Sequence, residues 1–109
     1  MSIPVTIAQL PDAMSAHIGW CYLLSVTEQG HPRVVAVTTT WSADGVSLRV
    51  QVGKGTATNL GSRPTLTLVW PPLDPAGMSL IVDGVAVVND LTVTIQPTSA
   101  VLHRSAMTP

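Results

Sequence analysis

The sequence has little charge, few aromatic residues and one cysteine. Charged residues make up 10% of the chain, whereas an average globular domain carries about 25%. Lys54 is the only lysine and the four arginines are scattered, so the clustered basic residues of a nucleic-acid-binding face are absent. Cys21, the only cysteine, can form no intramolecular disulfide and cannot build a cysteine-based metal site. We therefore expect neither a nucleic-acid partner nor a metal centre.

Candidate catalytic side chains are equally scarce. The three histidines lack the spacing of metal ligands, and no Gly-x-Ser-x-Gly segment or other nucleophile motif is present. Cys21 begins a strand-like run and is expected to be a small buried apolar residue rather than a reactive thiol. We assign no catalytic residue. This scarcity favours a binding module, or an enzyme whose cofactor carries out the chemistry.

Long hydrophobic runs are missing too. No apolar run approaches the ~18 residues that a membrane helix needs, and residues 1–10 lack the basic segment and apolar stretch of a signal peptide. The expectation is a cytoplasmic protein with no membrane partner.

The length fits a single domain, residues 1–109. A domain this small has a modest core, but 46% of its residues are hydrophobic, and this excess predicts a homodimer whose interface covers apolar side chains.

Apolar and polar residues alternate with a period of two along most of the chain, which is typical of half-buried strands. Val46, Leu48, Val50 and Val52, for example, share one face of a predicted strand. Gly84 interrupts another apolar run and predicts a bulge there. The pattern predicts about six strands in an all-β barrel or sandwich. The predicted strands cover residues 21–27, 33–41, 46–52, 65–70, 78–88 and 91–96, the last resuming to residue 103 after a break at Pro97.

Two segments depart from this alternation. Residues 7–18 predict a short helix, with Pro11 and Asp12 near its first turn. Residues 53–61 predict a glycine-rich loop entering a second short helix that stops at Gly61. The glycines would let the backbone approach a ligand, and the helix start, Lys54 and the nearby threonines would suit a phosphate. The simpler interpretation is a solvated turn into a helix with Thr56 as its N-cap.

Threonines 38–40 and Trp41 end the second predicted strand. They favour a barrel-rim strand with hydroxyl groups in water. The alternative is a row of hydroxyl and backbone groups that lines a cofactor.

Taken in order, these segments resemble the pyridoxamine 5'-phosphate oxidase-like superfamily, the split barrels that bind FMN or a deazaflavin. The resemblance covers nearly the whole chain. It implies an all-β fold with one or two short helices, namely a six-stranded antiparallel split β-barrel of the FMN-binding type. The segments that carry the resemblance are residues 22–27, 30–37, 41–52, 57–60, 63–71, 82–86 and 93–98.

The resemblance also implies a homodimer with two cofactor sites at its interface. The family's phosphate loop usually carries several cations, whereas here Lys54 is the only one. The implied cofactor is FMN or a deazaflavin, with its ring along the second strand and its phosphate at the glycine-rich loop. The residues implied for the ring are Val37, Thr38, Thr39 and Thr40, and those implied for the phosphate are Lys54, Gly55, Thr56 and Asn59, with Arg33 close to it.

The function that follows is a flavin- or deazaflavin-dependent oxidoreductase acting on a small organic substrate. Two alternatives remain open: a non-catalytic dimer that stores or senses a flavin or haem, and a structural dimer that has lost its cofactor.

Overall fold

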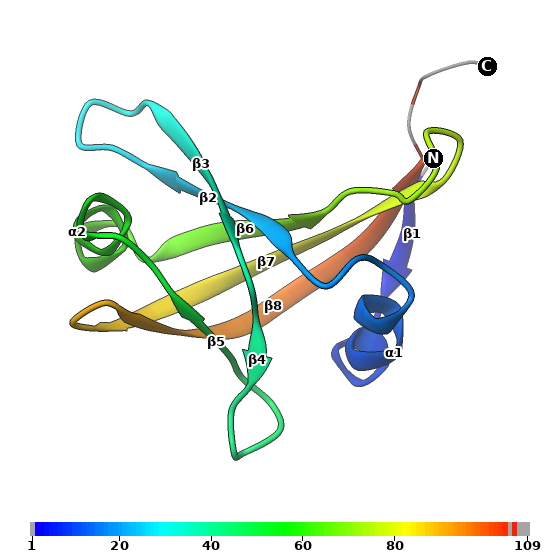
Figure 1. Cartoon of the computed structure of the whole chain (residues 1–109), viewed down its shortest axis with the longest axis horizontal. Coiled ribbons are helices and arrows are strands. Elements are labelled where there is room, and N and C mark those ends of the chain that lie inside the picture. Colours follow the sequence, from blue (N-terminus) through cyan, green and yellow to red (C-terminus); the bar gives the residue numbers. More distant parts are fainter. Residues whose placement is uncertain (1, 105, 107–109) are drawn as a thin grey trace.

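One curled antiparallel sheet carries most of the chain, with two short helices at its opposite ends (Figure 1). The computed structural model describes residues 2–104 and 106. The strands are β1 (Ser2–Val5), β2 (Cys21–Val26), β3 (Pro32–Val37), β4 (Thr40–Trp41), β5 (Leu48–Gln51), β6 (Thr65–Trp70), β7 (Met78–Asn89) and β8 (Thr92–Arg104). The helical segments are a 3₁₀ turn, η1 (Ile7–Gln9), and the helices α1 (Leu10–Ser15) and α2 (Lys54–Ser62).

The strand order is β3-β2-β6-β7-β8-β5-β4, and β1 pairs with the far half of β8. The prediction of six strands is therefore wrong, because the described residues form eight. Two causes explain the difference. Residues 2–5 form a strand too short to show an alternating pattern, and the predicted strand 33–41 divides into β3 and β4.

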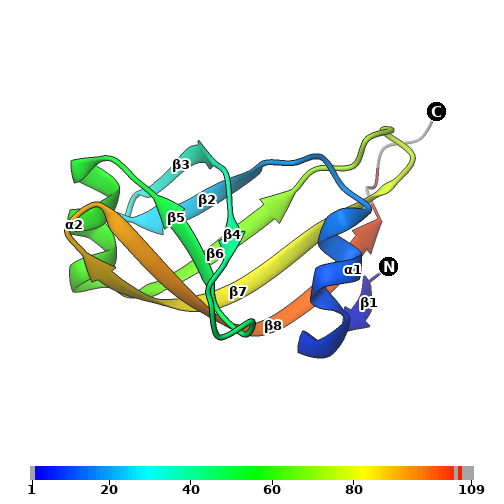
Figure 2. The same cartoon turned by 60° about the horizontal axis from the view of Figure 1, so that its bottom comes forward.

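The division of that strand closes the barrel. β3 and β4 are joined by Thr38 and Thr39 alone, yet they stand at opposite ends of the strand order. The first pairs with β2 and the second pairs with β5, so one short stretch of chain links the two edges of the sheet (Figures 1 and 2). This closure gives the split barrel that was predicted.

The core follows the predicted alternation. Leu48 and Val50 on β5 are buried, as the period of two requires. Val46 is the exception, at 52% exposed. It lies in the turn before β5, where the Asp44 carboxylate accepts hydrogen bonds from the backbone N–H groups of Val46 and Ser47 at 3.0 and 3.1 Å. The residues with no exposed surface include Leu23, Leu68, Leu80, Val82, Val93 and Ile95.

The predicted bulge at Gly84 is confirmed. The register between β7 and β8 shifts between Asp83, which pairs with Ser99, and Gly84, which pairs with Pro97. Pro97 has no N–H to donate to the ladder, and the shift lies directly opposite it. β8 therefore continues through Pro97 to Arg104 instead of breaking there.

Both predicted helices form with different bounds. The first is η1 followed by α1 and ends at Ser15, and Thr6 with Gln9 forms a capping box at its start. The second, α2, begins at Lys54 and lies against β2 and β7 (Figure 1). Thr56 is not its N-cap, because Gly53 occupies that position. Within the described residues, neither helix is long and apolar enough to cross a membrane.

Candidate functional site

The start of α2 is open to solvent and has no capping side chain. The first N–H groups of a helix lack intrahelical acceptors, and here the N-cap, Gly53, has no side chain to accept from them. Lys54 and Gly55 are exposed, and a Cβ atom added at Gly53 or Gly55 would meet nothing within 4 Å. Free N–H donors, the positive end of the helix dipole and one ammonium group fit an anion such as a phosphate.

Asn59 and Arg33 come together around Ser25 on β2. The Asn59 side-chain amide donates to Ser25 Oγ at 3.3 Å, and Arg33 is the register partner of Ser25 across β2 and β3. Paired residues of antiparallel strands project from the same face of the sheet. Two predicted site residues that are far apart in sequence are therefore both neighbours of Ser25, although the exposed Arg33 guanidinium group donates to the Pro32 carbonyl oxygen at 3.2 Å.

The rest of the predicted site divides into two parts. Thr56 lies in the first turn of α2 and is only 8% exposed. Lys54, Gly55 and Thr56 all lie within about 7.5 Å of Asn59 along the helix axis. Val37 is the last residue of β3 and is buried. Thr38 and Thr39 join β3 to β4, and Thr40 pairs with Arg49, four residues before Gly53. About 13 Å of extended chain at most thus separates the partner of Thr40 from Gly53, the N-cap of α2.

A polar cavity of about 450 Å³ lies between the second half of α2 and the turn that joins β2 to β3. Arg63, on its wall, donates from Nε to the Val26 carbonyl oxygen at 2.8 Å and so ties the end of α2 to β2. Asn59 is the one predicted site residue on the wall. The other lining residues are Thr27, Glu28, Gln29, Thr58 and Ser62. Of these, the sequence pattern singled out only Thr58, as one of the threonines suited to a phosphate.

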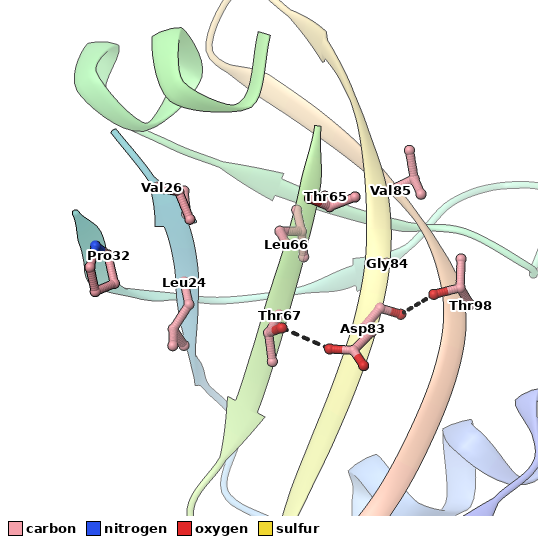
Figure 3. Close-up of a pocket in the computed structure, with 11 residues that line it drawn as sticks. Leu24, Val26, Pro32, Thr65, Leu66, Thr67, Asp83, Gly84, Val85 and Thr98 are labelled. Atoms are coloured by element: carbon pink, nitrogen blue, oxygen red, sulfur yellow. Dashed lines mark hydrogen bonds between the residues drawn. The ribbon is translucent and has the colours of Figure 1, made fainter. Parts of the chain in front are cut away.

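A second cavity, of about 480 Å³, lies on the outer face of the sheet across β2, β3, β6, β7 and β8 (Figure 3). Its walls are formed mainly by apolar side chains and threonines, and Asp83 lies among them. The Asp83 carboxylate accepts hydrogen bonds from Thr67 Oγ1 at 2.7 Å and from Ser99 Oγ at 3.2 Å. The bulge predicted at Gly84 was the only sign of this cavity in the sequence.

Comparison with known proteins bears on the family and the fold. No protein-family model matches the chain. Two relatives, "Uncharacterized protein Mb0449c" of Mycobacterium bovis and "Uncharacterized protein MT0457" of Mycobacterium tuberculosis, are each 37% identical to it. Each alignment is 114 positions long and covers 91% of this chain and 77% of the relative. The chain belongs to the family of these proteins.

Solved structures share its architecture. An F420 reductase matches with a TM-score of 0.63 and 16% identity, covering 82% of this chain and 94% of that one. HutZ, the haem storage protein of Vibrio cholerae, matches at 0.62 and 14%, covering 89% and 93%. A Listeria innocua protein named as a candidate pyridoxamine 5'-phosphate oxidase matches at 0.64 and 14%, covering 85% and 92%. The fold is therefore the split barrel that these proteins share.

Within this split barrel, Cys21 has no exposed surface, as expected of a small buried residue. Burial raises the pKa of its thiol to about 12, so the nucleophilic thiolate is suppressed at neutral pH. No group of three or more His, Cys, Asp or Glu side chains in residues 2–104 and 106 is arranged to hold a metal ion.

Proposed function

We propose that this chain is a homodimeric oxidoreductase that binds FMN or a deazaflavin and acts on a small organic substrate. The observation that carries the proposal is the uncapped, solvent-open start of α2, which carries the only lysine of the chain. Proteins with the same fold include an F420 reductase and a haem storage protein. The bound cofactor would supply hydride or electron transfer, for which this chain offers no evident acid, base or nucleophile of its own.

The phosphate would lie at the first turn of α2. Backbone N–H groups of Lys54, Gly55 and Thr56 would donate to it, and the Lys54 ammonium would add a full charge. Main-chain donors there would compensate for cations that the family usually supplies from side chains, because anion binding at a helix start depends on the N–H groups and the helix dipole together. The ring would lie toward Thr38 and Thr40, whose side chains are exposed.

The second subunit would cover β3. This strand is an edge of the sheet with an unpaired side, and residues 32–36 are exposed on both of its faces. Val34 is 55% exposed, and Tyr22, the register partner of Ala36 on β2, is also exposed. A long apolar edge is an aggregation hazard unless something covers it, and a second copy of the chain covers it at no risk of open-ended assembly when the contact is two-fold symmetric.

Replacing Lys54 by alanine is expected to weaken cofactor binding by about 10- to 100-fold, since a charge-assisted hydrogen bond contributes about 1.5–3 kcal/mol. Fluorescence titration with FMN and with a deazaflavin measures the affinity. The melting temperature should hardly change, because Lys54 is exposed. Arg104→Ala, which removes a cation at the far end of β8, is the matched control. Equal affinities of the native protein and Lys54→Ala would show that the phosphate does not lie at α2. A separate assay of turnover with the reduced cofactor distinguishes an enzyme from a carrier protein.

Val34→Glu is expected to convert the dimer into monomers. An unpaired carboxylate buried in the interface would weaken association by at least about 100-fold. The control is Val46→Glu, because Val46 is exposed to a similar extent, 52% against 55%, but lies in the turn before β5. Light scattering after size exclusion gives the mass of each variant. A native monomer, or a dimer that survives Val34→Glu, contradicts the proposed interface.

A further inference from the structure

Exposed aromatic surface is concentrated at one place among the described residues. The chain has three tryptophans, one tyrosine and no phenylalanine. Trp70 is 2% exposed and Trp41 packs against the core, whereas Trp20 and Tyr22 are 37% and 39% exposed. Large aromatic side chains gain much free energy from burial, so another molecule is expected to cover this exposed pair.

Trp20 and Tyr22 pack edge to face. Their ring centroids lie 5.0 Å apart and the angle between their planes is 87°. In such a contact the edge of one ring points at the face of the other, so Tyr22 covers at most one face of the Trp20 indole. The opposite face of the indole is free of Tyr22, and the contact restricts rotation of the indole.

The pair lies beside the place proposed for the cofactor ring. Cys21 pairs with Val37 at the end of the ladder between β2 and β3. Continuing this register by one residue sets Trp20 opposite Thr38, which is exposed and belongs to the proposed ring site. The exposed indole and the proposed ring position are therefore neighbours, although their residues lie far apart in sequence.

We infer that Trp20 stacks on the ring of the cofactor and that Tyr22 is a positioning residue for the indole. FMN and a deazaflavin both carry a planar tricyclic ring, whose faces need apolar contact and whose edge carries polar atoms. The hydroxyl groups of Thr38 and Thr40 suit that edge, whereas the indole suits a face. This inference rests on the proposed function and adds a side chain that contacts the ring by its face.

The test separates the ring of the cofactor from its phosphate. Trp20→Leu is expected to weaken the binding of both FMN and riboflavin about tenfold, as does the loss of an aromatic side chain that stacks on a nucleobase. Riboflavin carries the same ring without the phosphate, so Lys54→Ala should weaken the binding of FMN alone. Equilibrium dialysis measures each affinity. If the native protein binds only a deazaflavin, the phosphate-free form of that compound replaces riboflavin.

Trp20→Phe is expected to retain most of the affinity, because a phenyl ring still stacks, but to brighten the bound flavin. An indole in contact with a flavin quenches its emission by electron transfer, whereas a phenyl ring does not. A structural role for Trp20 would not separate affinity from emission in this way. The control is Ile3→Ala on β1, because Ile3 is exposed to a similar extent, 44% against 37%. This control should change neither affinity nor emission.

The outcomes distinguish this inference from the proposed function. Unchanged affinity of Trp20→Leu for FMN and riboflavin overturns the inference, and leaves the proposed function in place when Lys54→Ala still weakens FMN binding. Equally dim flavin in Trp20→Phe and the native protein also overturns it. A lower mass of Trp20→Leu in light scattering, with unchanged affinity, would show that a second copy of the chain alone covers the pair. Failure of the native protein to bind either cofactor overturns the proposed function and this inference together.

Discussion

Gly84→Ala is expected to lower the free energy of unfolding by about 3 kcal/mol, because an added methyl group has no room at the bulge. A Cβ atom at Gly84 would lie 2.7 Å from Ile95 Cγ2 and 2.9 Å from the Gln96 carbonyl oxygen. The Ile95 side chain is completely buried, and the Gln96 carbonyl belongs to the β8 backbone. Neither can move away without disturbing the longest strand pair of the sheet.

The measurement is urea denaturation at one fixed protein concentration, since the stability of a chain that associates depends on concentration. Gly61→Ala is the matched control. A Cβ atom at Gly61 would meet nothing within 4 Å, and alanine is favoured over glycine in a helix by about 1 kcal/mol. The two glycine-to-alanine changes should therefore move the denaturation midpoint in opposite directions. A midpoint unchanged by Gly84→Ala would mean that β7 and β8 separate easily at the bulge.

The native protein should react with iodoacetamide at least about 1000-fold more slowly than the unfolded chain at pH 8. Burial raises the pKa of the Cys21 thiol from 9.0 to about 12, and three pH units correspond to about a 1000-fold smaller thiolate fraction. The side chain also has no exposed surface. Mass spectrometry of the alkylated protein, with and without urea, measures both rates at a single site because Cys21 is the only cysteine.

The same pKa shift fixes the sign of a pH effect on stability. The folded state holds the proton of the Cys21 thiol more tightly than the unfolded state, so this stabilisation is complete below pH 9 and is lost as the pH rises toward about 12.

The labelling experiment would contradict the first expectation if the rates in water and in urea were comparable. Such rates would show that the strand carrying Cys21 opens readily.

The alternation of apolar residues was sufficient to predict most of the strands. It located β6 and β7 to within one residue at their ends, since these central strands have one face in the core. It failed where the cause is not local. Val46 has the right spacing for β5 but lies in a turn held by the Asp44 carboxylate. The break at Thr38 and Thr39 arises because the chain changes pairing partners there, from β2 to β5.

The candidate site could be predicted only in part for the same reason. The start of α2 is local in sequence, and the glycines with Lys54 marked it. The meeting of Arg33 and Asn59 at Ser25 depends on strand register and on where α2 lies. The Asp83 cavity draws its walls from five strands, and its carboxylate is held by Thr67 and Ser99, 16 residues away on either side. No pattern within a single segment contains that information.

The number of paired residues differs between the strand pairs of the barrel. β7 and β8 pair along twelve positions, but closure between β4 and β5 rests on two, Thr40 with Arg49 and Trp41 with Leu48. Separating this seam would break few hydrogen bonds and leave the central strands in place. We therefore expect the pairing of β4 with β5, next to Thr38 and Thr39, to open locally before the central strands unfold.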